Sequence, residues 1–264
     1  MMNQIKIYLA IYKKFLDCAF SRATTFRTSF FLIVIMDLFF YASVLGSVDF
    51  IFQHVPSIGG WNRDQFLFFL SFMLAIDNLH MSFLSENFWI FALDLRSGVL
   101  DYVFIRPVSS IFLIFFRSIR VSTMLNTPLV MYFLIHFGTQ AGLHAFDFLL
   151  LPFLLIISLL IMVEIEIIIS TLMFWLIEGN GINFLRMQLQ NVARWPDFVY
   201  GQWAKRFFTL FCPVLLIGTP SVRFIFNKAD YFPLLLEFLA MIALYILMTK
   251  FWFYGLRKYE SASS

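Results

Sequence analysis

The chain has 264 residues, of which 61% are hydrophobic, 20% aromatic and only 13% charged. The net charge of +3 is too small to indicate nucleic-acid binding, and the two cysteines, Cys18 and Cys212, indicate no disulfide framework. Most of the chain is therefore expected to have lipid as its solvent. In the hydrocarbon core, every backbone N–H and C=O group needs a hydrogen bond within the protein, and only helices and closed barrels provide this. The expected fold class is therefore all-α.

The first predicted element is an amphipathic helix over residues 3–20. Apolar side chains recur at helical spacing from Ile7 to Ala19, and Lys6 and Lys13 fill other positions. This pattern is typical of an interfacial helix on the inner leaflet; a basic leader that only sets orientation is the alternative. Because basic residues interrupt the apolar run and no small-residue cleavage pattern follows, we expect no cleaved signal peptide.

Long apolar stretches follow this helix. A hydrocarbon core about 30 Å thick needs roughly 20 residues of helix. The stretches that meet this length predict five spans, over residues 28–52, 65–84, 111–137, 146–177 and 232–254.

The region between the last two of these spans allows two topologies. In the first, residues 179–206 form a cytoplasmic loop and 207–226 form a span. In the second, 180–194 form a short, polar span and 205–226 form a re-entrant hairpin from the outer side. Irregular backbone at membrane depth requires surrounding protein or water in either case.

The distribution of lysine and arginine orients the spans, since cytoplasmic loops carry an excess of both. The first topology puts 16 of these residues on one side and 3 on the other, and the second puts 13 against 6. Both topologies predict that the two termini are cytoplasmic.

The inner loop at 85–110 has its own pattern. Apolar residues from Phe88 to Val99 recur at helical spacing, Gly98 predicts a break between two short helices, and Pro107 disfavours helical geometry at Arg106. Such an element could dock a cytoplasmic partner or simply connect two spans, and the pattern alone does not decide between them.

Acidic residues inside the predicted spans are the remaining candidates for chemistry: Asp37, Asp77, Glu164 and Glu166. Each costs about 3 kcal/mol at the bilayer centre, so each is expected to have a function or a hydrogen-bonding partner. Glu164 and Glu166 point about 200° apart on a helix and do not line one face. They indicate either a proton or substrate path, or hydrogen bonding between helices or to a partner subunit. We favour the second interpretation, because no paired base is recognised inside the membrane.

Catalytic motifs are missing from the sequence. It contains no G-x-x-x-x-G-K-[ST] loop for phosphate, no H-E-x-x-H, no Cys/His cluster at zinc spacing and no G-x-S-x-G. We therefore expect no catalytic residue, bound cofactor or metal in this chain.

The inner loop also carries a family signature. Residues 98–108 resemble the G-x-L-D-x-x-L-x-R-P-V motif that follows the second span in six-span ABC-2-type permeases, with Phe104 in place of the usual Leu. Further similarities occur in the same order along the chain: Gly60-Trp61, Phe174-Trp175, Trp195-Pro196, Tyr200, Arg206, Pro213, Pro220 and the ending at 255–264.

The resemblance implies one ABC-2-type transmembrane domain over residues 1–264, similar to type V exporters. It comprises an interfacial helix (1–27), spans one to four with the inner loop (28–178), and the fifth span, re-entrant region and sixth span (179–264). The loop would be a coupling helix that contacts an ATPase, and the re-entrant hairpin would roof the pathway. The implied contact residues are Phe91, Asp94, Leu95, Arg96, Gly98, Asp101, Arg106 and Pro107, and the implied hairpin residues are Pro213, Gly218 and Pro220.

The implied function is that of a permease subunit of an ATP-driven exporter in a bacterial inner membrane. Its implied partners are two copies of an ABC ATPase that carry ATP and Mg, a second permease, identical or homologous, and membrane lipids. An ATP-independent channel or proton-coupled carrier that uses the intramembrane acids is one alternative, and a scaffold that transports nothing is another. The sequence does not identify the substrate.

Overall fold

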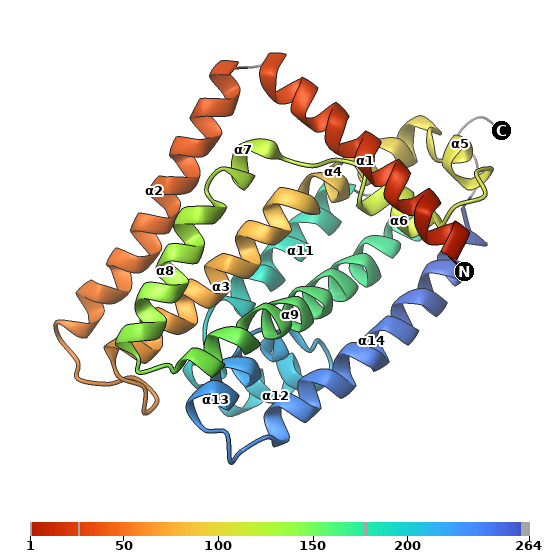
Figure 1. The fold of residues 1–264 in the computed structure, drawn as a ribbon. Helices are drawn as coiled ribbons and strands as arrows, with labels where there is room; N and C mark the ends of the chain where they lie inside the picture. The colour runs from red at the N-terminus through yellow and green to blue at the C-terminus, as the bar shows by residue number, and fades with distance from the viewer. Residues whose placement is uncertain (1, 26, 177–178, 260–264) are drawn as a thin grey trace.

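The computed structural model describes residues 2–25, 27–176 and 179–259, and within these ranges it contains helices and no strand (Figure 1). The last residue of the predicted span 146–177 and residues 260–264 of the C-terminal motif lie outside the described residues. The helices are, in chain order, α1 (Met2–Thr25), α2 (Arg27–Phe52), α3 (Arg63–Phe83), α4 (Ser85–Ser97), α5 (Leu100–Phe104), α6 (Ser110–Phe115), α7 (Val121–Met124), α8 (Thr127–Gln140), α9 (Ala145–Thr171), α10 (Met173–Leu176), α11 (Gly179–Ala193), the 3-10 turn η1 (Asp197–Val199), α12 (Gln202–Leu210), the 3-10 turn η2 (Val214–Leu216), α13 (Thr219–Phe226) and α14 (Phe232–Leu256).

Four helical segments are long and apolar enough to cross a membrane: Phe30–Phe52, Arg63–Phe83, Ala145–Leu176 and Phe232–Leu256. They confirm the predicted spans 28–52, 65–84, 146–177 and 232–254. In the part of the chain that the structure describes, the number of such spans rises to five only if α12 and α13 are counted together as one bent span.

Helix α3 is the centre of the bundle. Its residues from Phe66 to Asn78 are all buried, and it packs along α8, α2 and α9. A helix that is apolar on all sides is expected in the interior, because every face needs an apolar neighbour. A capping box, in which Asn62 and Gln65 bond each other's backbone N–H groups, fixes where α3 begins.

The predicted span 111–137 is wrong as a single helix. It divides into α6, α7 and α8, and the 14 residues of α8 extend only about 21 Å. The break at 116–120 is stabilised by buried polar groups: Asn87 accepts from the Ser118 N–H (2.7 Å) and donates to the Ser118 carbonyl (2.9 Å), and Ser82 O accepts from the Arg120 N–H (2.7 Å). These contacts replace the backbone bonds that a continuous helix would make, which is the condition for irregular backbone inside a membrane protein.

The loops gather at two opposite ends of the bundle. At one end, Trp61 contacts Phe198 (ring centroids 4.9 Å apart) and Lys228 pairs with Asp147 (2.5 Å). At the other end, Tyr8 of α1 accepts from the Ser109 N–H (3.0 Å). Figure 1 shows four parts of the chain at this end: the N-terminus of α1, the whole of α4 and α5, and the C-terminal end of α14. By the distribution of basic residues, the first end is the expected outer end and the second is the expected inner end.

The contact between Trp61 and Phe198 favours the second of the two sequence-based topologies. The first topology places residues 179–206 on the inner side, but Phe198 lies at the same end as the outer loop after α2. The run 207–226 is also no continuous helix, since α12 and α13 meet at 87°. That geometry matches the bent hairpin of the second topology, in which α11 returns the chain to the outer end.

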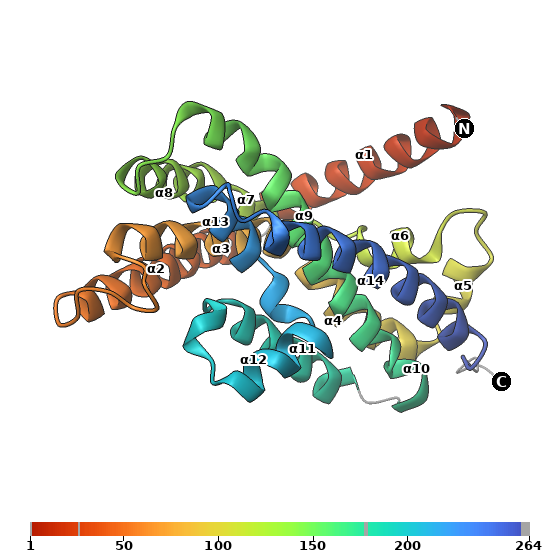
Figure 2. The ribbon, with the colours of Figure 1, turned by 90° about the horizontal axis from the view of Figure 1, so that it is seen from below.

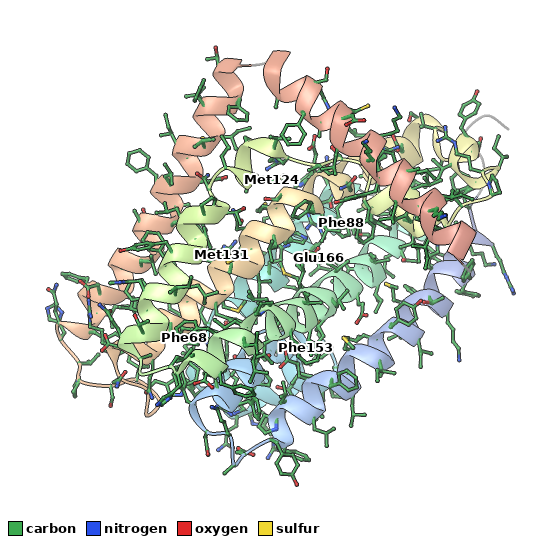
Figure 3. All side chains as sticks on the ribbon, viewed as in Figure 1. Phe68, Phe88, Met124, Met131, Phe153 and Glu166 are labelled. Carbon is green, nitrogen blue, oxygen red and sulfur yellow. The ribbon has the colours of Figure 1, made fainter. Side chains whose placement is uncertain are left out.

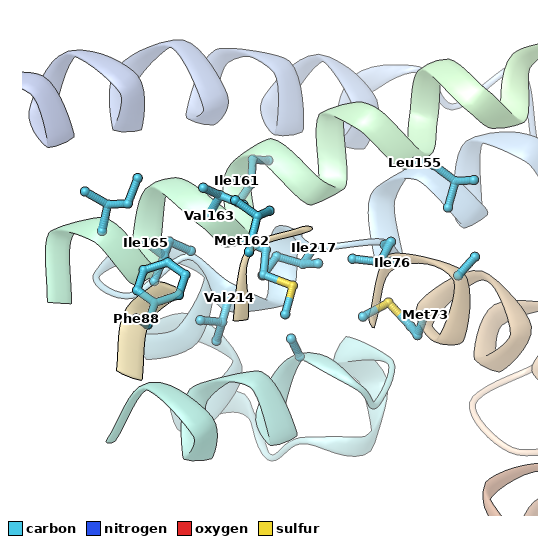
Figure 4. Close-up of a cluster of buried hydrophobic side chains, with 14 of the residues drawn as sticks. Met73, Ile76, Phe88, Leu155, Ile161, Met162, Val163, Ile165, Val214 and Ile217 are labelled. Atoms are coloured by element: carbon cyan, nitrogen blue, oxygen red, sulfur yellow. The ribbon is translucent and has the colours of Figure 1, made fainter. Parts of the chain in front are cut away.

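The turn between α12 and α13 enters the core. Val214 and Ile217 are buried beside Met162 and Ile165 of α9 and face α11 (Figure 4). Figure 2 shows α11 and α12 on one side of α9 and α14, opposite to α8. Gly218 has φ +76°, and a Cβ there would lie 2.5 Å from the Met73 sulfur. Glycine is therefore required where the hairpin turns against α3.

Candidate functional site

Helices α4 and α5 form a hairpin at the inner end of the bundle. Gly98 ends α4 in the left-handed conformation, with φ +73°, and α5 follows after one residue. This confirms the predicted break, because a glycine at this position closes a helix without steric cost. Pro107 lies in the exposed turn after α5, before α6 begins.

The apolar side of α4 packs inside this chain. Phe91 is fully buried, and its ring lies 5.4 Å from Phe115, 5.6 Å from Phe174 and 5.7 Å from Trp252. Leu95 is also buried. Both residues were expected to be apolar anchors for a partner. Within this chain, Phe91 instead packs α4 against α6, α10 and α14, and Leu95 is part of the same buried core.

Asp94 also packs inside this chain. It is buried and pairs with Arg117, in the break between α6 and α7. Its carboxylate is occupied by a cation 23 positions later in the chain, so it stabilises the hairpin from inside, and its contact with a partner stays a prediction. The sequence alone gave no sign of this pair, since it depends on the break.

The exposed side of the hairpin holds the remaining predicted residues. Arg96, Arg106 and Pro107 are exposed, and Tyr102 and Ile105 beside them are 69% and 79% exposed. Asp101 is half-buried next to Tyr259, where burial and this carboxylate raise the pKa of the phenol to about 12, so the phenol stays neutral. The hairpin therefore presents an apolar tip flanked by cations.

The predicted intramembrane acids have partners on other helices. Asp77 of α3 accepts from Arg194 Nε (2.8 Å), just after α11. Asp37 of α2 accepts from the Asn126 side chain (3.4 Å), between α7 and α8. Each contact joins segments at least 89 positions apart in the chain, which fits the interpretation as bonds between helices.

Glu166, which Figure 3 labels, lies at the centre of a buried polar cluster. One oxygen lies 3.0 Å from Arg186 Nη1 and also accepts from Gln190, and the other lies 2.5 Å from His80 Nε2. The cluster joins α9, α11 and α3. The adjacent cavity measures only about 10 Å³, which is no larger than one water molecule. This arrangement indicates that the cluster holds three helices together and does not form an open path for protons or substrate.

Glu164 is also buried, but it does not share this cluster's hydrogen bonds. Its Oε2 has no hydrogen-bond partner among the described residues. Two residues along the helix from Glu166, it falls on another face, as the sequence predicted.

Several polar residues were missed by sequence reasoning. The sequence did not predict that His80, Arg186 and Gln190 contact Glu166. Arg186 was used only as one of the basic residues that orient the spans. Glu237, an acid inside the last span, was also missed: it is fully buried and accepts from Ser158 (2.7 Å) and Ser221 (2.7 Å). An acid within the apolar run 232–254 was itself a signal that could have found it.

Comparisons with known proteins identify the class. The family model described as ABC-2 family transporter protein matches residues 31–263, nearly the whole chain. The chain therefore belongs to the ABC-2 family, and it is a membrane protein with the role of a permease. The comparison with curated proteins found no match, and neither did the comparison with solved structures.

Proposed function

We propose that this protein is the membrane subunit of an ATP-driven exporter and that a separate ABC ATPase supplies the energy. Two copies of that ATPase would bind the inner end of a permease dimer, formed with an identical or homologous chain. ATP and Mg would reside on the ATPase. The expected location is a bacterial inner membrane, with both termini cytoplasmic.

One observation carries this proposal: the α4–α5 hairpin is rigid on one side and open on the other. Its buried side is held by Phe91 and by the Asp94–Arg117 pair, whereas Tyr102, Ile105 and Arg106 are exposed at its tip. Exposed apolar side chains on a rigid element are suited to a protein partner, because little conformational entropy is lost on binding. A load on this tip would be transmitted directly into α6, α10 and α14.

As a mechanism, ATP binding would draw the two ATPase subunits together and move the hairpins with them. The permeases would then shift as rigid bodies about their interface. Such a shift requires the ATPase to contact the hairpin differently in its two states, since a ligand changes an equilibrium only through differential affinity.

The buried acids give less support to a proton-coupled carrier. Glu166 is paired within the chain, and the space beside it is too small for a continuous row of waters. A scaffold without transport is distinguished from the exporter by the same experiment that tests the ATPase contact.

The test changes the hairpin tip in the full chain and measures two quantities: the ATPase that co-purifies from membranes in mild detergent, and its ATP hydrolysis rate. We expect Ile105→Asp and Arg106→Glu each to reduce co-purification of the ATPase about tenfold. The first change removes an apolar contact from the proposed binding surface, and the second reverses a charge on it. Arg206→Glu is the matched control, since Arg206 is exposed on α12, at the opposite end. Unchanged co-purification and hydrolysis in both hairpin variants would remove the hairpin from the mechanism.

A further inference from the structure

A small pocket lies at the outer end and is lined by residues of α12, α13 and the start of α14. Figure 1 shows where these three helices lie. Its volume is about 190 Å³. The polar residues that line it are Asp197, Lys205, Thr209, Thr219 and Arg223. We infer that this pocket binds the anionic head group of an amphiphilic molecule, whose apolar part lies in the outer leaflet.

The charge balance of the pocket favours an anion. Asp197 is the single acid among its lining residues, and both of its oxygens are occupied, by Lys205 Nζ at 2.7 Å and by Arg223 Nη2 at 2.6 Å. Two cations thus share one carboxylate. An ammonium has three donors and a guanidinium has five, so both retain donors for a second anionic oxygen.

Thr219 gives independent evidence for a ligand. The residue is 2% exposed and lines the pocket, and its hydroxyl has no hydrogen-bond partner within the described part of the chain. An unsatisfied buried hydroxyl costs about 1–3 kcal/mol, so such groups are rare unless something else occupies the site. The hydroxyl oxygen lies just beneath the pocket surface, so a rotation of this side chain would let it donate to an anionic oxygen held by Lys205 and Arg223.

Two helix N-termini add to the positive potential. Thr219 and Pro220 form the first turn of α13, and Phe232 and Pro233 form the first turn of α14; all four residues line the pocket. The positive end of a helix dipole attracts anions. Neither helix begins with a charged residue that would occupy this position.

The amphipathic character of α12 indicates that the ligand also has an apolar part. Lys205 and Thr209, one turn apart, line the pocket. On the other faces of the same helix, Trp203 is 85% exposed and Phe211, just past its end, is 82% exposed. A helix with charged and aromatic faces lies in a membrane interface. A head group in the pocket therefore lies next to lipid, and 190 Å³ leaves room for the head group alone.

The experiment measures lipid retained by the purified full-length chain in native mass spectrometry, after addition of dioleoyl phosphatidylglycerol. Dioleoyl phosphatidylcholine supplies the same tails without net charge, and inorganic phosphate supplies the anion without tails. We expect phosphatidylglycerol to bind about tenfold more tightly than either, because charge-assisted hydrogen bonds and apolar contact act together. Equal retention of the two lipids would overturn the inference, and so would phosphate displacing the lipid at equal concentration.

Three variants locate the binding. Lys205→Gln and Thr219→Val should each lower phosphatidylglycerol retention at least about threefold, since each removes one donor to the head group. Thr219→Val leaves the ion pairs of Asp197 intact, so its effect does not depend on whether Lys205→Gln folds normally. Lys228→Gln is the control, because Lys228 pairs with Asp147 outside the pocket. An equal loss in the control, or no loss in Thr219→Val, would refute the site.

A head group of this kind belongs either to a resident lipid or to the transported substrate. Reconstituted permease and ATPase distinguish them with fluorescent phosphatidylglycerol: ATP-dependent movement across the vesicle identifies cargo, and binding without movement identifies a resident lipid. Either result supports the pocket. Since the binding measurement uses the permease alone, it stands even if no ATPase is found for this chain.

Discussion

Arg186 is 1% exposed, yet it carries a full charge among apolar helices. Glu166 neutralises it at 3.0 Å, and the Phe88 ring lies 4.6 Å from the guanidinium carbon. Removal of one partner from a buried pair leaves the other charge without solvent or counterion, which costs much more than the pair contributes. The cluster therefore determines how α11 packs against α9.

We predict that Glu166→Gln destabilises the folded protein by about 3–5 kcal/mol, because Arg186 then remains buried and unpaired. The measurement is the thermal midpoint of aggregation in detergent, followed by fluorescence-detected gel filtration. Addition of Arg186→Met in the same chain should recover part of the loss, since the second change removes the uncompensated charge.

Glu86→Gln is the matched control for that experiment. Glu86 lies 3.9 Å from Arg22 at a partly exposed site, where ion pairs contribute less than about 1 kcal/mol. If Glu166→Gln and Glu86→Gln lower the thermal midpoint equally, the buried cluster does not stabilise the fold more than an exposed ion pair does.

At the scale of single elements, the Asn87 side chain makes two of the hydrogen bonds that stabilise the break between α6 and α7. The Asn87 amide bonds both the N–H and the carbonyl of Ser118. Without these bonds, two buried backbone groups would have to find other partners. Asn87 thus holds α4 and the broken helix together.

Asn87→Ala should destabilise the fold by about 2–4 kcal/mol, because it leaves two buried backbone groups of Ser118 unsatisfied. Protection of the backbone amides at 116–120 should fall in hydrogen exchange, while that of α14 should not. Asn227→Ala at the exposed outer turn is the control and should change neither quantity. Retained protection at 116–120 would mean that Asn87 does not support the break.

The elements differ in how far the sequence predicts them. Spans such as 28–52 and 232–254 were predicted correctly because little of either helix is buried in the bundle. Their apolar sequences therefore match the lipid that is expected around them, and no distant residue is needed to explain them. The run 111–137 is also apolar but is broken, because the groups that stabilise the break, Asn87 and Ser82, lie 31 and 38 positions before the backbone groups that they bond. Likewise, Asp94, which the family resemblance assigned to a partner contact, is buried by its pairing with Arg117.

The turn at Gly218 provides another test at this scale. Gly218→Ala should destabilise the fold by about 1–3 kcal/mol, since the left-handed conformation disfavours a side chain and the Cβ would meet the Met73 sulfur. Met73→Ala in the same chain should relieve the contact but not the backbone strain, so the double variant should lose less than the sum of the two single variants. Thermal midpoints of the four proteins measure this coupling. Full additivity would show that the two residues do not touch.

For the whole molecule, the two ends of the bundle differ in charge and in shape. The inner end presents α1 and the α4–α5 hairpin, and the outer end presents short loops and the bent α12–α13 region. The excess of basic residues favours a cytoplasmic location for the inner end. The position of η1 beside Trp61 places the start of α12 at the outer end, together with the loop before α3.

This orientation predicts which single cysteines react with a membrane-impermeant maleimide in intact cells, in a Cys18→Ser, Cys212→Ser background. Ser57→Cys and Gln202→Cys should react from outside, because both positions are exposed at the outer end. Ser97→Cys, exposed on α4, should react only after the membrane is permeabilised. Labelling of Ser97→Cys in intact cells would reverse the orientation. If Ser57→Cys is labelled in intact cells but Gln202→Cys is not, α12 lies on the inner side of the membrane. The hairpin that lines the anion pocket would then lie on the inner side as well.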